Sequence, residues 1–244
     1  MNVAIILAGG KGVRAGLKVP KQFAEVLGKP VIAYTLEIFQ KHPEIDAIEI
    51  VCVKGYIDQL WDICRRYSIT KTKWIVEGGA TYQESALHGV QGMIGKLSDD
   101  DIVTIHTGVA PFLDADLLTE NLEVCREKGN AITSYTLYAL AGKRNEEHPE
   151  MTNEGIDRDS IICLKNPHSF RFGEIRTLYE EAITTGVIDQ VKPYTTSLMF
   201  RMGRPIYLSR GTQMNIKITK KEDLELLEAF VMMKKKQGGS HEEV

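Results

Sequence analysis

The chain has 244 residues, enough for one large domain or two small ones. Hydrophobic residues make up 43% of it and charged residues 26%, which is typical of a globular protein and excludes an intrinsically disordered chain. Thirty basic residues against 33 acidic ones give a net charge of −3, so the chain lacks the overall positive field of a nucleic-acid-binding protein.

The predicted secondary structure alternates short strands with longer helices. Strands are predicted where β-branched and apolar residues form short runs, at Val3–Leu7, Ala47–Val53, Lys73–Val76, Ile102–His106 and Ala131–Tyr138. Helices are predicted where apolar residues recur at helical spacing, at Val31–Gln40, Tyr56–Tyr67, Thr81–Ile94, Leu113–Lys128, Phe172–Thr185 and Lys221–Lys235. Strands that are apolar on both faces and alternate with helices predict an α/β fold, with a mostly parallel sheet flanked by helices.

One stretch breaks this alternation. Residues Ala141–Asp159 are polar and rich in Glu, Asn and Gly, which predicts an excursion from the sheet. We therefore expect a single domain over residues 1–237, with a projecting arm at about 139–162. Residues 238–244 are expected to form a disordered tail.

The sequence carries no sign of a membrane span or of secretion. The N-terminal apolar stretch is short, lacks a preceding basic segment and ends at glycines, so we interpret it as a buried strand. No apolar run approaches the roughly 20 residues that cross a bilayer. The four cysteines, Cys52, Cys64, Cys125 and Cys163, lie far apart without a CxxC pair, which indicates reduced packing residues in a cytoplasmic protein.

The first predicted strand continues into a glycine-rich loop. Leu7-Ala8-Gly9-Gly10-Lys11-Gly12-Val13-Arg14 is followed, after five residues, by Pro20-Lys21-Gln22. Glycines let a backbone turn tightly and present its N–H groups to an anion. The spacing matches neither a Rossmann fingerprint nor a Walker A motif. The loop could wrap a triphosphate, with Arg14 and Lys21 as cations, or it could be an ordinary strand-to-helix turn.

This loop resembles the signature loop of the sugar-alcohol-phosphate cytidylyltransferases, the family of 2-C-methyl-D-erythritol 4-phosphate and ribitol-5-phosphate cytidylyltransferases. Five further segments are similar to segments of that family and come in the same order. They are Gly78–Ser85, His106–Pro111, Ile156–Arg158, Asn166–Phe170 and Met214–Leu224. The resemblance covers nearly the whole chain and implies a single Rossmann-like nucleotidyltransferase domain with a projecting β-arm.

The resemblance also implies a reaction and roles for individual residues. CTP would react with a sugar-alcohol phosphate, of the methylerythritol 4-phosphate or ribitol 5-phosphate type, to give a CDP-alcohol and pyrophosphate. Such a reaction needs cations that balance the charge developing on the phosphates, and no serine nucleophile. The family pattern gives catalytic roles to Arg14, Lys21, Lys217 and Arg158, the last reaching from the arm of a dimer partner. Its nucleotide-binding positions fall on Leu7, Ala8, Gly9, Gly10, Gly12, Gly78, Gly79, Ser85, His106 and Thr107.

The chain departs from the family pattern where that family binds Mg²⁺. Thr107 and Met214 stand at positions where the family has acidic ligands, and a hydroxyl or a thioether is a poor substitute for a carboxylate. The sequence therefore predicts no protein ligand for a metal, although CTP could still carry Mg²⁺ on its own phosphates. Further departures, at Tyr82, Ala110 and His168, lie on the metal and acceptor side.

Other carboxylates are poor candidates for the missing ligands. Asp99-Asp100-Asp101 precede the fourth predicted strand, so they should lie at the opposite end of the sheet in a turn. Asp114 and Asp116 lie closer, but they stand where a helix is predicted to begin, and we expect them to cap it.

Two functions of different classes fit this mixture of retained and lost residues. The first is an active CTP-dependent cytidylyltransferase with altered metal handling, which forms a homodimer through its arm. The second is a catalytically degenerate member that serves as a nucleotide-binding or regulatory subunit. The retained cations favour the first function, which we expect, and the lost carboxylates favour the second. Neither nucleic acid nor a membrane is expected as a partner.

Overall fold

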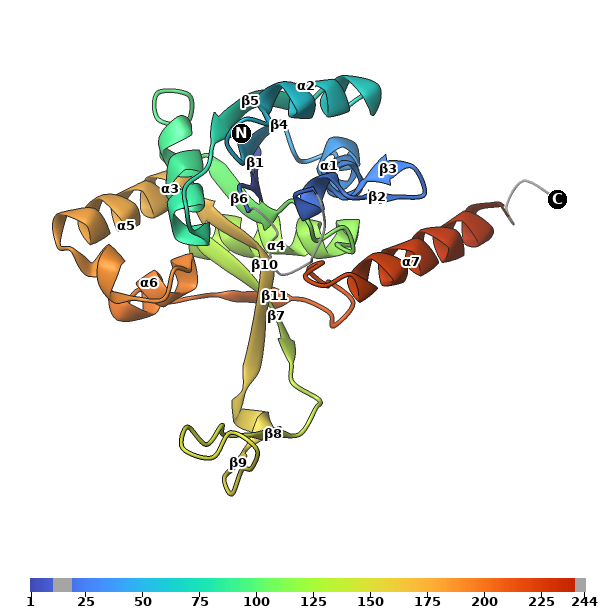
Figure 1. Cartoon of the computed structure of the whole chain (residues 1–244). Helices are drawn as coiled ribbons and strands as arrows, with labels where there is room; N and C mark the ends of the chain where they lie inside the picture. Colours follow the sequence, from blue (N-terminus) through green and yellow to red (C-terminus); the bar gives the residue numbers. More distant parts are fainter. Residues whose placement is uncertain (11–18, 240–244) are drawn as a thin grey trace.

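Apolar, β-branched segments form the centre of a seven-stranded sheet in the computed structural model, which describes residues 1–10 and 19–239 (Figure 1). The strand order is β11-β7-β10-β6-β1-β4-β5. The strands are β1 (Asn2–Ala8), β4 (Ala47–Cys52), β5 (Thr72–Glu77), β6 (Ile102–Thr107), β7 (Asn130–Thr136), β10 (Ile162–Arg171) and β11 (Leu208–Arg210). Strands β5, β4, β1 and β6 pair in parallel, as do β7 and β11, whereas β10 is antiparallel to both of its neighbours. The predicted mostly parallel sheet is confirmed.

Helices cover both faces of the sheet. Helices α1 (Val31–Lys41), α2 (Ile57–Arg66) and α4 (Ala115–Lys128) enclose one apolar core, and α3 (Tyr82–Gly92), α5 (Phe172–Thr184) and α6 (Thr195–Arg201) enclose the other. Successive side chains of a strand point to opposite faces, so Ala4, Ile6 and Ala8 of β1 enter the first core while Val3, Ile5 and Leu7 enter the second. This explains why β1 is apolar throughout.

A third apolar cluster joins the last helix to the body. Helix α7 (Glu222–Gly239) packs against residues around α1 and the short hairpin of β2 (Glu25–Val26) and β3 (Lys29–Pro30). The helix extends to Gly239, two residues into the segment 238–244 that was predicted to be a disordered tail. Residues 240–244 lie outside the described residues.

The polar segment after β7 forms an arm. Strand β7 and the first half of β10 lead away from the sheet to a small hairpin of β8 (Ala141–Gly142) and β9 (Gly155–Ile156) (Figure 1). A 3-10 turn, Arg158–Ser160, follows β9. The excursion expected from composition is therefore present as a projecting β-arm.

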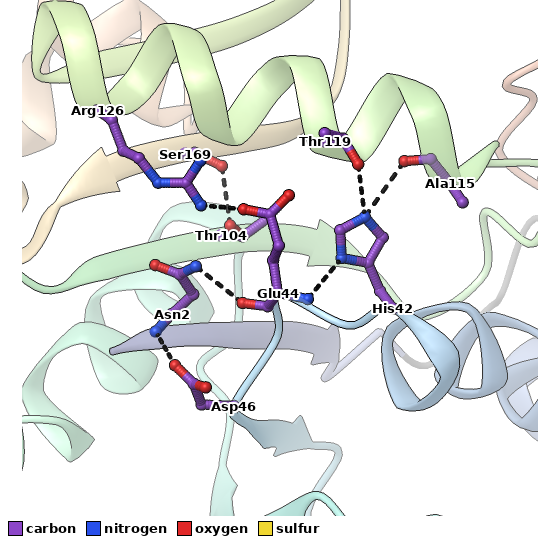
Figure 2. Close-up of polar contacts among 9 residues, drawn as sticks. All are labelled: Asn2, His42, Glu44, Asp46, Thr104, Ala115, Thr119, Arg126 and Ser169. Atoms are coloured by element: carbon purple, nitrogen blue, oxygen red, sulfur yellow. Dashed lines mark hydrogen bonds and ion pairs between the residues drawn. The ribbon is translucent and has the colours of Figure 1, made fainter.

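The edge at which the parallel strands begin is closed by polar contacts (Figure 2). The backbone N–H of Asn2 donates to Asp46 (2.6 Å), and its side-chain amide donates to the carbonyl of Glu44 (2.8 Å). Glu44 also pairs with Arg126 of α4, and His42 contacts a threonine hydroxyl of the same helix. These contacts join the loop before β4 to β1 and α4.

Most predicted elements agree with the structure within about two residues, but strands β2, β3, β10 and β11 and helix α6 were missed. Strand β10 contains Pro167 and a register shift between Lys165 and His168, which disrupt the pattern of a strand. Strand β11 and helix α6 are short, with three and seven residues. Within the described residues no helix has the length and apolarity needed to cross a membrane, and all four cysteines are free.

Candidate active site

A cavity of about 340 Å³ lies at the carboxyl ends of β1 and β6. It is enclosed by the glycine-rich loop, the start of α3 and the segment before α7. Its described lining residues are Leu7, Ala8, Gly9, Gly10, Lys21, Gln22, Gly79, Ala80, Thr81, Tyr82, Ser85, Thr107, Val109, Lys217 and Thr219. Nine of the sequence-predicted site residues are thus brought together: Leu7, Ala8, Gly9, Gly10, Lys21, Gly79, Ser85, Thr107 and Lys217. The predicted residues Gly12 and Arg14 lie outside the described residues.

Two glycine segments pack against each other at the base of the cavity. A Cβ added to Gly9 would lie 2.9 Å from the Ser85 hydroxyl oxygen, and one added to Gly78 would lie 3.3 Å from the Cα of Gly9. Glycine at both positions therefore leaves room for the Ser85 hydroxyl, and at Gly78 also for the backbone of Gly9. Gly78 itself lies behind Gly9 and does not line the cavity.

Gln22 holds the turn of the glycine-rich loop. Its side chain is buried, and its amide nitrogen donates to the carbonyls of Ala8 (2.8 Å) and Gly10 (3.0 Å). With these carbonyls bound on the protein side, the backbone of residues 8–10 is fixed next to the cavity. No role was predicted for Gln22; the available signal was its position directly after the predicted cation Lys21 in the motif Pro20-Lys21-Gln22.

The N-terminus of α3 forms a second wall. Thr81 caps the helix by accepting from the N–H of Glu84 (3.1 Å), and the Glu84 carboxylate accepts in turn from the N–H of Ala80 (2.6 Å). The Ser85 hydroxyl accepts from the N–H of Gly79 (3.2 Å). Helix N-termini carry partial positive charge, so this wall favours an anionic or polar ligand.

Two lysines from distant parts of the chain line the same cavity. The Lys21 ammonium donates to the carbonyl of Ile218 (2.9 Å), the residue after Lys217. Lys21 belongs to the short 3-10 helix Lys21–Phe23. The contact therefore joins Lys21 to the segment before α7, and the two lysines make the cavity electropositive.

His106 has a structural position. Its ring is completely buried beside Phe39, and its Nε2 donates to the carbonyl of Ala110 (3.0 Å). Burial lowers the pKa of His106 to about 4, so the imidazole is neutral at physiological pH. The ring is not part of the cavity lining, and the predicted nucleotide contact of this residue is not supported by its side chain.

The described residues do not form a magnesium site. Thr107 lines the cavity, but Met214 is 51% exposed and lies outside the lining, whose described residues include no carboxylate. Among the described residues no cluster of three or more histidine, cysteine or acidic side chains could hold a metal. Asp114 caps α4 by accepting from the N–H of Asp116 (3.1 Å), as expected.

Arg158 lies in the arm, outside the cavity lining. Its guanidinium donates to the carbonyl of Tyr138 (3.2 Å), so the contact lies within the arm itself. Its predicted role depends on a second subunit.

Tyr82 is a lining residue noted in the sequence only as a departure from the family pattern. Its hydroxyl donates to Asn166 Oδ1 (3.4 Å), and its ring lies 5.8 Å from that of Tyr194. It thus connects the cavity to β10 and to the start of α6.

Comparison with known proteins gives a consistent result. The model of the 2-C-methyl-D-erythritol 4-phosphate cytidylyltransferase (IspD) family matches residues 2–233. Ribitol-5-phosphate cytidylyltransferase of Lacticaseibacillus paracasei is 38% identical, covering 96% of this chain and 99% of that protein. 2-C-Methyl-D-erythritol 4-phosphate cytidylyltransferase of Clostridium tetani is 34% identical, covering 94% and 90%. The crystal structure of 4-diphosphocytidyl-2C-methyl-D-erythritol synthase from Anaerococcus prevotii shares the fold, with a TM-score of 0.76, 23% identity and coverage of 95% and 96%.

Proposed function

The chain belongs to the 2-C-methyl-D-erythritol 4-phosphate cytidylyltransferase family, and we propose that it transfers the CMP group of CTP to a sugar-alcohol phosphate with release of pyrophosphate. The observation that carries this proposal is the cavity in which the glycine-rich loop, Ser85 and two lysines meet. Backbone N–H groups and lysine side chains are the usual means of binding a triphosphate.

In the proposed reaction an oxygen of the acceptor phosphate attacks the α-phosphorus of CTP. A new bond joins that oxygen to the α-phosphorus, and the bond between the α-phosphorus and the leaving pyrophosphate breaks. The acceptor phosphate is already an anion at neutral pH, so no side chain has to remove a proton. Lys21 and Lys217 would stabilise the negative charge that develops on the α-phosphate and on the pyrophosphate.

The two kinds of relative suggest two acceptors. Ribitol-5-phosphate cytidylyltransferases are 38% and 34% identical to this chain over nearly its full length, which supports ribitol 5-phosphate. A methylerythritol-phosphate cytidylyltransferase is also 34% identical. We propose ribitol 5-phosphate as the first acceptor to test, with methylerythritol 4-phosphate beside it.

The arm supports a homodimer. It projects from the body and exposes apolar side chains, among them Tyr138 (70%) and Leu140 (91%). Burial of these side chains against a second subunit would stabilise a dimer and bring Arg158 to the partner's acceptor phosphate. A cytoplasmic location is also proposed, because reduced cysteines are typical of that compartment.

A catalytically degenerate subunit remains the second candidate function. It is favoured by one observation, the absence of carboxylates from the described lining of the cavity. Such a protein would bind CTP and show no turnover with either acceptor.

The test is pyrophosphate release from CTP with each acceptor, over a range of Mg²⁺ concentrations. Lys217→Met should lower kcat at least 100-fold if the ammonium stabilises the transition state. Lys220→Met, which removes an exposed charge three residues along the same segment and outside the cavity, is the matched control and should retain activity. CTP binding by the unaltered protein without turnover would instead support the degenerate subunit.

A further inference from the structure

Helix α7 continues beyond its contacts with the body. Its inner residues Leu224, Leu227, Phe230 and Val231 belong to the third apolar cluster, whereas residues 232–236 are all exposed. Figure 1 shows this last part of the helix extending away from the sheet. An isolated helical segment is marginally stable in water, so a helix of this kind gains from a covering partner.

On the side of α7 that faces away from the body, the type of residue changes regularly along the helix. At about 100° per residue, seven residues share this side, and all seven are exposed. They form the outer face of α7: Glu222, Glu225, Leu226, Ala229, Met232, Met233 and Lys236. The face is acidic at its start, apolar in its middle and basic at its end.

We propose that the outer face of α7 binds a second copy of this chain, with the two helices antiparallel about a twofold axis at Ala229. An antiparallel arrangement places Glu222 of each helix against Lys236 of the other and Leu226 against Met232, while Glu225 lies beside Met233. A parallel arrangement would place like charges together. A twofold pair uses the same surface twice, so this face has to be complementary to itself. Glu222 at its start and Lys236 at its end provide that complementarity.

The register follows from the spacing along the helix. Glu222 and Lys236 are each seven residues from Ala229, so Glu222 of one copy lies beside Lys236 of the other. Leu226 and Met232 are each three residues from Ala229, so Leu226 of one copy contacts Met232 of the other across the axis. The small side chain of Ala229 lets the two helices approach closely where they cross.

A lipid surface explains the outer face less well. Helices that lie on a membrane combine an apolar face with basic residues. On the outer face of α7, Glu222 and Glu225 stand at the start of the helix, next to the apolar residues. An anionic bilayer would repel these two carboxylates. A second α7, reversed in direction, supplies the opposite charge at both ends.

The pairing should be weak and sensitive to salt. The seven residues span about 21 Å of helix, which is a small contact surface. The ion pairs at its ends are exposed and are screened at high ionic strength. A covalent trap is therefore the suitable measurement.

The experiment uses the full chain with Cys163→Ser, since the other three cysteines are buried. Ala229→Cys is added and the protein is oxidised at micromolar concentration. Because residue 229 lies on the twofold axis, we expect most of the protein to become a disulfide-linked dimer on a non-reducing gel. Lys235→Cys, exposed on the same helix but off the outer face, is the matched control and should cross-link at least tenfold less. Equal cross-linking of the two variants, or none, would overturn the proposal.

Charge reversal gives a second test that does not depend on a disulfide. The double variant Glu222→Lys, Glu225→Lys and the single variant Lys236→Glu should each weaken self-association at least tenfold in sedimentation equilibrium at low salt. Mixing the two should restore it, because their outer faces are complementary. A dimer formed through the arm would be present in every sample, so it does not affect the difference in self-association between the variants and their mixture. Unchanged association in the mixture, or binding of unpaired protein to phosphatidylglycerol vesicles that is lost in Met232→Glu, Met233→Glu, would contradict the pairing.

Discussion

The edge of the central sheet at which the parallel strands begin and the edge at which they end use the same kinds of side chain for different purposes. Where the parallel strands begin, the amide of Asn2 and the carboxylate of Glu44 bind neighbouring loops and α4 and close the edge (Figure 2). Where the strands end, the amide of Gln22 binds the glycine-rich loop and leaves a cavity beside it. The first set of contacts joins parts of the fold, and the second also shapes the backbone beside the cavity in which we propose that CTP binds.

This difference agrees with the chemistry of parallel sheets. Ligands in such folds bind beyond the carboxyl ends of the strands, where loops and helix N-termini meet. Substitutions at the edge where the strands end should therefore change both stability and the KM for CTP, whereas substitutions at the edge where they begin should change stability alone. Matched variants at the two edges test this difference.

The largest effect is expected for Gln22→Leu. The change leaves the carbonyls of Ala8 and Gly10 without their buried donor, at a cost of about 1–3 kcal/mol in the free energy of unfolding. The backbone at Ala8 and Gly10 is no longer held beside the cavity, so the KM for CTP should rise at least tenfold. Asn2→Leu removes the hydrogen bond from the Asn2 side-chain amide to the carbonyl of Glu44, at the other edge. This variant should be less stable without a change in the KM for CTP. A similar rise in KM for both variants would contradict the separation of the edges.

Gly9→Ala should be the next most damaging change. The added methyl group would lie 2.9 Å from the Ser85 oxygen, and such overpacking costs about 1–3 kcal/mol. Gly10→Ala is the control, since a Cβ there meets no described atom within 4 Å. Urea unfolding should rank Gly10→Ala well above Gly9→Ala in stability. If Ser85→Ala fails to recover part of the loss, another contact is responsible.

Glu49, in the middle of β4, should make stability depend on pH. It is completely buried, and neither carboxyl oxygen has a hydrogen-bond partner among the described residues, so burial raises its pKa from 4.5 to about 8. Between these values the folded protein holds a proton that the unfolded chain releases. The free energy of unfolding therefore falls as pH rises, by up to about 1.4 kcal/mol per unit.

Comparison with Glu49→Gln isolates this effect. The amide cannot ionise, so the variant should become more stable relative to the unaltered protein as pH rises from 5 to 8. Buried histidines such as His106 titrate in both proteins and cancel from the difference. A stability difference that is constant across this pH range in urea unfolding would show that Glu49 is already ionised in the fold.

The smallest effect is expected at the closed edge. The ion pair of Arg126 and Glu44 is partly exposed, with 43% and 31% of the two side chains accessible, so Arg126→Ala should cost about 0–1 kcal/mol. The loss should shrink in high salt, and the KM for CTP should not change. An altered KM would mean that the two edges are coupled through α4.

The residues of the cavity were largely predictable because they occur in short motifs. Leu7–Gly10, Lys21, Gly79, Ser85, Thr107 and Lys217 all line it, although they come from four segments of the chain. What the motifs could not show was which side chains line the cavity. His106 lies within a motif yet is buried against Phe39, and Met214 lies within another yet points to solvent.

The sequence by itself determined the alternation of strands and helices, the polar arm and the glycine-rich loop. These features depend on local spacing and composition, which a chain carries wherever it folds. The tertiary structure decided the place of β10, the meeting of Lys21 with Ile218 and the exposure of one face of α7. Each of these depends on contacts between residues far apart in the chain, and no local pattern specifies which distant groups will meet.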